Sequence, residues 1–372
     1  MLTTHVGSLP REQDVVDVVF AEDDGRPVGR EEFDRVVGAA VADRVRRQAD
    51  AGVDLVSDGE MSKIGYATYV ARRLSGFDPD GDYPRATPAD LDAFPRFRDR
   101  QVAEGAGPKY RRPVCRGEIA YEHREPLERD LAALRAAVDA VDVAGAFMNA
   151  PSPGVIALFL PNEHYATTDA YLEAIAAAMR VEYEAIVAAG FDLQIDAPDL
   201  AMGRHIMYRD QPDEVFVERI ATHVSALNGA LAGIPPERVR LHVCWGNYEG
   251  PHIYDIPVSK IMGEVLRARP ATLLFEAANP RHAHEWVDWR DAPIPGDKVL
   301  APGVIDTSTN YVEHPALVAE RLRRFADIVG ADRVIASTDC GFGTWAGFGP
   351  IDHDVCWAKL RALAEGAELA SS

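Results

Sequence analysis

Apolar positions recur along the chain at two spacings, one typical of helices and one typical of buried strands. An early run returns to the same helix face every three or four residues, at Phe33, Val36, Val37, Ala40, Val41 and Val45. Two later runs, 172–186 and 317–329, repeat this spacing less regularly. Glycines that suit the left-handed position just past a helix, Gly52 and Gly190, follow the first two runs and precede apolar segments. The pattern therefore predicts helices that alternate with strands.

Short apolar segments supply the candidates for those strands. They lie near residues 2–7, 53–57, 113–119, 145–149, 191–195, 239–244, 272–276, 298–304 and 333–337. Strands that alternate with helices form βα units in a parallel sheet. We therefore predict an α/β fold, a closed (β/α)₈ TIM barrel, within a single domain over residues 1–372. A barrel needs eight strands, so one candidate is expected to be a rim strand or to be misassigned.

One stretch interrupts the alternation of helices and strands. Residues 78–112 follow the second candidate strand and carry five prolines among charged residues. Long connections in compact domains are commonly lids or binding loops. We predict that this insertion lies over the C-terminal face of the barrel, where the active sites of this fold are found.

Composition narrows the classes of partner. The chain has 39 Lys and Arg against 59 Asp and Glu, a formal net charge of −20, which argues against nucleic acid and anionic membranes as partners. It has no uninterrupted apolar stretch long enough to span a bilayer, and the first residues lack the features of a signal peptide. Four cysteines are too few for a disulfide framework. We expect a reduced, cytoplasmic protein in which Cys115 and Cys356 are inert buried thiols.

Candidate metal ligands lie at the ends of three predicted strands. His242 and Cys244 are two residues apart in a strand, so their side chains share one face. Glu276 ends another apolar strand, and Cys340 follows a third. A His-x-Cys pair alone is more often packing than ligation, and a terminal Glu is more often a solvated rim residue. Because strand ends converge in a barrel, the coincidence favours a zinc site with N, S and O ligands.

Further motifs occur in a fixed order from the first residues to about 343. They are residues 3–11, 58–60, 194–196, 242–244, Glu276, 302–306 and 339–341. This ordered set resembles the catalytic, C-terminal half of cobalamin-independent methionine synthases, a family related more widely to epoxyalkane:coenzyme M transferases and uroporphyrinogen decarboxylases. The resemblance implies a TIM barrel and a transferase that makes homocysteine sulfur reactive as a zinc thiolate.

The resemblance also implies roles for individual residues. It assigns Zn²⁺ to His242, Cys244, Glu276 and Cys340. It assigns the amino-acid end of homocysteine to the backbone near Gly7 and Ser8 and to the carboxylates of Glu60 and Asp196. Glu276 is the ligand expected to loosen when the substrate sulfur binds, because oxygen is the harder donor.

Two departures from the family pattern bear on the methyl donor. Residues 150–160 contain no Trp to stack on a folate, and residues 306–311 contain no His to protonate the folate leaving group. We therefore expect a donor other than methyltetrahydrofolate. A small methyl donor, a methylated corrinoid protein or an epoxide remain possible. An epoxide would require an acid near the oxygen that its opening releases.

Candidate acids and cations can be named for the epoxide alternative. The acids are Tyr311, His5, His164 and His252, of which we favour the first two as catalytic residues. The sulfonate of coenzyme M would need cations from Lys63, Lys109, Arg111 or Arg112, whereas Glu60 and Asp196 favour an aminothiol. A metal-free lyase resembling uroporphyrinogen decarboxylases, or a thiol-binding barrel without activity, stays open as another class. The complete His/Cys/Glu/Cys set argues against both.

Overall fold

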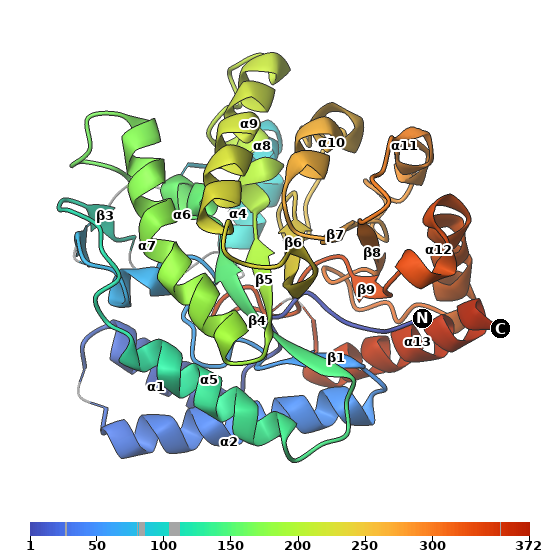
Figure 1. Ribbon diagram of the computed structural model, residues 1–372, viewed down its shortest axis with the longest axis horizontal. Helices are drawn as coiled ribbons and strands as arrows, with labels where there is room; N and C mark the ends of the chain where they lie inside the picture. Colours follow the sequence, from blue (N-terminus) through green and yellow to red (C-terminus); the bar gives the residue numbers. More distant parts are fainter. Residues whose placement is uncertain (27, 80, 82–85, 104–111, 350) are drawn as a thin grey trace.

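The computed structural model describes the chain except for residues 27, 80, 82–85, 104–111 and 350. Its main sheet is parallel and runs in the order β1-β4-β5-β6-β7-β8-β9, surrounded by helices (Figure 1). The strands are β1 (Leu55–Ser57), β4 (Gly145–Pro151), β5 (Asp192–Asp196), β6 (Val239–Val243), β7 (Thr272–Glu276), β8 (Val299–Ile305) and β9 (Ser337–Thr338). This succession confirms the predicted α/β barrel class.

The N-terminal segment fills the eighth position of the barrel. The Thr4 amide donates to the Ala336 carbonyl at 2.8 Å, just before β9, and the Ala336 amide donates to the Leu2 carbonyl at 2.9 Å. On the other side, the Leu55 amide of β1 donates to the Thr3 carbonyl at 3.0 Å. Residues 2–4 therefore lie between β9 and β1 and close the cylinder.

The candidate strand at 113–119 is the one that lies outside the barrel. Within it, β3 (Val114–Cys115) pairs antiparallel with β2 (Phe77–Asp78) in a separate two-stranded sheet. The connection after β1 also carries η1 (Thr68–Arg72), α3 (Ala89–Ala93) and α4 (Pro95–Ala103). The predicted insertion at 78–112 thus follows the second barrel position, as expected, although part of it lies outside the described residues.

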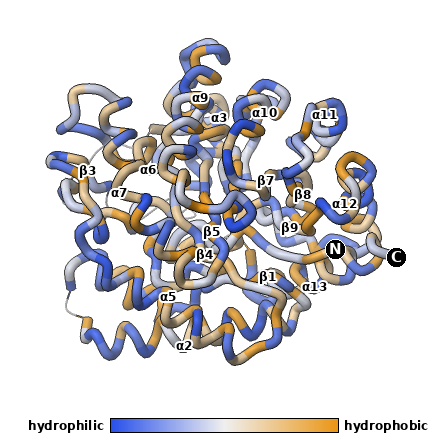
Figure 2. Tube along the Cα trace, viewed as in Figure 1, coloured by the Kyte–Doolittle hydropathy of each residue, from blue (hydrophilic) through white to orange (hydrophobic). Residues whose placement is uncertain are grey.

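Amphipathic helices cover the sheet. The longer ones are α1 (Gln13–Asp23), α2 (Arg30–Asp50), α5 (Glu125–Val138), α7 (Thr168–Ala188), α9 (Asp213–Ala230), α10 (Val258–Arg267), α12 (Pro315–Val329) and α13 (His353–Ser371). The shorter ones are α6 (Pro153–Phe159), α8 (Gly203–Ile206), α11 (Trp286–Asp291), η2 (Pro198–Leu200), η3 (Pro236–Arg238) and η4 (Ala331–Arg333). Along the outer helices polar and apolar residues alternate (Figure 2), and α2 buries the predicted face at Phe33, Val37 and Val41. Among the residues described, no helix combines the length and apolarity needed to cross a membrane.

An aromatic contact between α12 and β7 shows how the helices are held. Phe325 of α12 is 2% exposed and meets Phe275 of β7 edge to face, with ring centroids 5.5 Å apart. Phe275 in turn stacks on Trp289 at 4.0 Å. Because Phe275 precedes Glu276, this packing supports the strand end that faces the candidate site.

We expect Phe325→Ala to lower the free energy of unfolding by about 3–5 kcal/mol, because it deletes a buried ring from a close-packed contact. Leu317→Ala on the same helix is the matched control. Leu317 is 40% exposed, so its truncation should cost less than about 1 kcal/mol. Denaturant titration of the two variants checks this, and equal losses would contradict the packing described.

Candidate functional site

A cavity of about 670 Å³ lies at the C-terminal ends of the strands. Its inner wall carries the predicted site residues Glu60, Asp196, His242, Cys244 and Cys340. Its outer wall includes residues of the insertion, namely Pro88, Leu91, Arg98, Gln101, Val102 and Arg112. The insertion therefore borders the cavity, as predicted.

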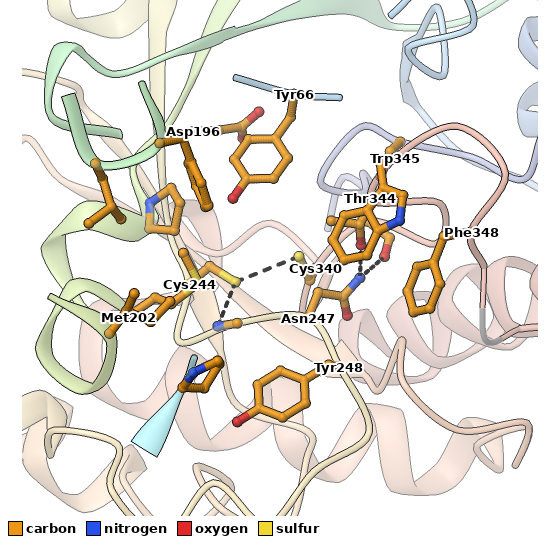
Figure 3. Close-up of a pocket in the computed structure, with 18 of the residues that line it drawn as sticks. Tyr66, Asp196, Met202, Cys244, Asn247, Tyr248, Cys340, Thr344, Trp345 and Phe348 are labelled. Atoms are coloured by element: carbon orange, nitrogen blue, oxygen red, sulfur yellow. Dashed lines mark hydrogen bonds between the residues drawn. The ribbon is translucent and has the colours of Figure 1, made fainter. Parts of the chain in front are cut away.

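His242, Cys244 and Cys340 bring three metal-ligating atoms within 4.8 Å of one another. The two sulfurs are 3.7 Å apart and point toward each other (Figure 3). In a tetrahedral zinc site, two Zn–S bonds of about 2.3 Å separate the sulfurs by about 3.8 Å. Nε2 of His242 is buried without a hydrogen-bond partner. This unpaired nitrogen and the sulfur spacing fit a divalent ion such as Zn²⁺.

The pKa values of Cys244 and His242 are both shifted upward by their neighbours. The neighbouring Cys340 thiol, burial and the charge of Glu276 raise the pKa of Cys244 well above its ordinary value. Burial would lower the pKa of His242, but the carboxylate of Asp196, 3.4 Å from Nδ1, and the other anionic neighbours raise it on balance. A metal ion would supply the positive charge that a thiolate requires here.

Glu276, the fourth predicted ligand, is not part of this group of three. Oε1 accepts from the Trp245 amide and Oε2 from the Asn279 side chain, each at 2.8 Å. The loop after β7 is held by Asp339, whose carboxylate accepts the amides of Ala277, Ala278 and Asn279 at 2.8 Å. The structure thus brings three of the four predicted ligands together and leaves Glu276 engaged with backbone and amide donors.

Glu60 and Asp196 line the same cavity and are 2% and 5% exposed. Asp196 accepts hydrogen bonds from Gln194 and Asn149 at 3.0 and 2.9 Å, whereas Oε2 of Glu60 has no partner. Glu60 also adopts a left-handed backbone conformation, with φ of 59°, which is uncommon for a residue with a side chain. Burial raises the pKa of Glu60 to about 7; Lys63 opposes this shift and Asp196 adds to it. Two buried carboxyl groups beside a cavity favour a cationic ligand.

Gly7 and Ser8 lie next to this wall. Gly7 has φ of 141°, and a Cβ there would meet the side chain of Asn149 at 2.4 Å. The amide of Gly7 donates to Nδ1 of His5 at 3.1 Å. Ser8 lines the cavity, and its hydroxyl would meet a Cβ on Gly341, the residue after Cys340, at 1.9 Å. The N-terminal segment is therefore packed directly against the cysteine loop.

The residues predicted as acids are not brought into the cavity. His5 is buried against Gln48 at 2.7 Å, and burial lowers its pKa to about 4. Tyr311 is 84% exposed, and His164 is exposed as well. His252 lies outside the cavity lining and holds Asp255 at 2.8 Å. Exposure and burial of this kind depend on tertiary packing, which local sequence does not reveal.

The predicted cations are also dispersed. Arg112 lines the cavity and donates to the carbonyl groups of Leu158 and Phe159. Lys63 is buried and donates to the Asn149 carbonyl at 2.7 Å. Lys109 and Arg111 lie outside the described residues.

Sequence reasoning missed several cavity residues. Tyr66, Tyr248, Trp345 and Phe348 bring aromatic rings to the cavity, and the last two stack at 4.5 Å. They follow other strands than the segment in which we looked for a Trp. His205 of α8 also lines the cavity, and the only available signal was its place shortly after the Asp196 strand.

Comparison with known proteins identifies a family model and relatives that match this chain. The catalytic-domain model of the cobalamin-independent synthases matches residues 155–348, more than half of the chain. A 2-hydroxypropyl-CoM lyase of Xanthobacter autotrophicus is 26% identical over 362 residues, covering 89% of this chain and 84% of that protein. A methionine synthase of Saccharolobus solfataricus is 24% identical over 372 residues, covering 99% and 94%.

Solved structures show the same fold. The B12-independent methionine synthase from Shewanella sp. W3-18-1, in complex with selenomethionine, superposes with a TM-score of 0.73 at 20% identity. It covers 99% of this chain and 97% of that one. A protein from Listeria monocytogenes described as a vitamin-B12 independent methionine synthase gives 0.66 at 19% identity, with coverage of 99% and 97%.

The buried carboxyl of Glu60 predicts a pH dependence of stability. The unfolded chain loses this proton near the ordinary pKa of 4.5, whereas the folded protein keeps it up to about pH 7. Folding therefore takes up a proton in this window, and the free energy of unfolding should fall as the pH rises through it, by on the order of 1–3 kcal/mol. Glu60→Gln should flatten that fall in denaturant titrations at pH 5 and pH 7.5. Glu320→Gln, at an exposed pair with Arg324, should leave the slope unchanged, and an unaltered slope in Glu60→Gln would refute the assignment.

Proposed function

The chain belongs to the cobalamin-independent methionine synthase family, and we propose from this that it is a zinc-dependent transferase that alkylates the sulfur of a small aminothiol resembling homocysteine. The observation that carries the proposal is the shared cavity. It places the His242, Cys244 and Cys340 ligand atoms within 4.8 Å of one another, beside the carboxyl groups of Glu60 and Asp196. A nucleophile site and an ammonium site are thus neighbours.

His242, Cys244 and Cys340 would hold the metal, with Glu276 as the fourth ligand. Zn²⁺ bound there would lower the pKa of a substrate thiol, so that its sulfur is nucleophilic at neutral pH. The Gly246 amide, which donates to the Cys244 sulfur at 3.2 Å, supports the thiolate form of that ligand. Asp196 lies opposite His242 in the register of β5 and β6 and orients its ring through Nδ1.

Glu60 and Asp196 would bind the substrate ammonium. A charged amine placed between them would satisfy the unpaired Oε2 of Glu60 and stabilise the ionised form of that carboxyl group. The same pair would repel a sulfonate. We therefore favour homocysteine or a similar aminothiol over coenzyme M.

The donor that we propose is not methyltetrahydrofolate. Residues 150–160 carry no Trp, and residues 306–311 carry no His. A small methyl donor remains the first candidate, and the relatives reported above give no support to a corrinoid protein. The second candidate, thiol addition to an epoxide, is favoured by the likeness to a 2-hydroxypropyl-CoM lyase. Arg98 and Arg112 are described cations at the cavity wall that could then face a sulfonate.

Removal of one ligand should abolish zinc binding and activity without unfolding the protein. We expect about one equivalent of zinc in protein purified without chelator, and less than about a tenth in His242→Ala or Cys340→Ser, with activity reduced at least about 100-fold. The thermal midpoint should hold, because a core of this size does not depend on a metal.

Cys356→Ala is the matched control, since Cys356 is buried in α13 away from the cavity lining. Metal analysis and thermal unfolding are the measurements. A ligand variant that unfolds would indicate a structural metal site. Wild-type protein with less than about half an equivalent of zinc would favour the metal-free lyase.

Glu60→Gln should weaken aminothiol binding while zinc content stays constant. Loss of a charge-assisted hydrogen bond corresponds to a dissociation constant about 10- to 100-fold higher for homocysteine. The affinity for 4-mercaptobutyrate, the same thiol without its amino group, should hardly change. Calorimetry of both thiols measures this, with Glu249→Gln at the exposed cavity rim as the control. Equal effects on the affinities of the two thiols would contradict the proposed ammonium site.

A further inference from the structure

Three histidines surround one buried carboxylate behind the cavity wall. Asp255 lies 2.9 Å from Nδ1 of His205, 2.8 Å from Nδ1 of His252 and 3.0 Å from Nε2 of His282. Burial would raise the pKa of Asp255, but contact with the three histidines lowers it well below its ordinary range. Asp255 is therefore a fixed negative charge that can orient each ring.

Two of these histidines are engaged at both nitrogens. The second nitrogen of His252 lies 3.0 Å from the Tyr248 carbonyl, and that of His282 lies 2.8 Å from Glu285. The ring of His282 also packs against that of Trp245 in a tilted arrangement, with 4.3 Å between ring centroids. Because both nitrogens of each ring are engaged, these two histidines have no nitrogen left for a ligand, and we assign them a positioning role.

His205 differs from them in one respect that bears on catalysis. It is 1% exposed and lines the cavity, and both of its ring nitrogens are buried without a hydrogen-bond partner, although Nδ1 lies 2.9 Å from Oδ1 of Asp255. Because Nδ1 faces Asp255, Nε2 is on the opposite edge of the ring and is the nitrogen left for a ligand. Met202 and Cys244, whose backbones are joined by a hydrogen bond of 3.1 Å, line the cavity with it.

We propose that His205 is the general acid of this cavity and that the electrophile leaves through a nitrogen or oxygen atom that must be protonated. This rests on the proposed thiol alkylation and extends it by naming the class of electrophile. A carboxylate beside Nδ1 can orient the ring so that Nε2 is the nitrogen presented to the substrate.

The step is balanced without a further reactant. The substrate sulfur forms a bond to carbon with its electron pair, and the carbon–oxygen or carbon–nitrogen bond breaks. That bonding pair stays on the oxygen or nitrogen, which takes the proton from Nε2 of His205. The ring then takes up one proton, which balances the proton that the thiol released on ionisation. For an epoxide, the product is a 2-hydroxyalkyl thioether.

Electrophiles that differ in their need for an acid test this proposal. Homocysteine is supplied with 1,2-epoxypropane or methyltetrahydrofolate, whose leaving atoms need a proton, or with methyl iodide, whose leaving iodide does not. In wild type we expect turnover with the epoxide and none with the folate, in keeping with the proposed function. His205→Gln and His205→Phe should lower that turnover at least about 100-fold and leave methylation by methyl iodide within about threefold of wild type.

His223→Gln is the matched control. His223 is 9% exposed and pairs with Asp199 at 2.8 Å, but it does not line the cavity. A binding measurement separates positioning from proton transfer. It compares the affinity for S-(2-hydroxypropyl)homocysteine with the affinity for S-propylhomocysteine, which lacks the hydroxyl group. A hydrogen bond to the hydroxyl should favour the former about tenfold. His205→Phe should lose that preference, and His205→Gln, which keeps a donor, should retain part of it.

The outcomes separate this proposal from the proposed function. If His205→Gln opens the epoxide as wild type does, or if wild type reacts only with methyl iodide, His205 is not the acid. Absence of zinc together with no reaction of methyl iodide in wild type would remove the thiol alkylation and this proposal with it. Folded His205 variants, verified by thermal unfolding, are required for each comparison.

Discussion

Main-chain hydrogen bonds on both sides of residues 2–4 hold the barrel closed, and the site depends on that closure. Leu2 and Thr4 bond to Ala336 next to β9, and Thr3 bonds to Leu55 of β1. In the order of the sheet, β7 and β8 separate β6 from β9. An open sheet would spread these strand ends apart. Closure turns them toward one another, so that Cys244 and Cys340 meet with their sulfurs at 3.7 Å.

The second organising feature is an excess of buried acidic groups around the cavity. Burial raises the pKa of Glu60 to about 7 and that of Asp339 to about 8, and the pKa of Cys244 is raised as well. Each value says that the anion is poorly stabilised by the protein itself. A divalent ion at the thiols and an ammonium group at the carboxylates would each stabilise nearby anions. The two cations of the proposed chemistry, a divalent ion and an ammonium group, would therefore each lie where the protein itself stabilises anions poorly.

How far the sequence predicts this site depends on whether a residue's role is local. The His242-x-Cys244 pair could be found because His242 lies in β6 and Cys244 directly follows it, and α2 shows its buried face through its spacing. His5 and His205 show the opposite case. His5 belongs to a recognisable motif but turns to Gln48, whereas His205 has no local motif and depends on Asp255, fifty residues later. Contacts between residues so far apart in the sequence are set by tertiary packing, and the spacing of apolar residues along the chain does not predict them.

In the proposed reaction, different parts of the chain would bind the thiol and the electrophile. Strand ends and the closing segment line the inner cavity, where the thiol would bind, whereas α3, α4 and the Trp345–Phe348 loop line the outer cavity. Asp90 of α3 ties the insertion to the histidine network, because it accepts hydrogen bonds from the Tyr248 hydroxyl at 2.8 Å and the Ile253 amide at 3.0 Å. Tyr248 also contacts His252, a partner of Asp255. Changes in the insertion could therefore alter the outer cavity and the surroundings of His205 together, without changing the strand ends that would hold the substrate sulfur. The chain is similar to proteins named for two different reactions, a methionine synthase and a 2-hydroxypropyl-CoM lyase, and such a division would let one barrel accommodate either electrophile.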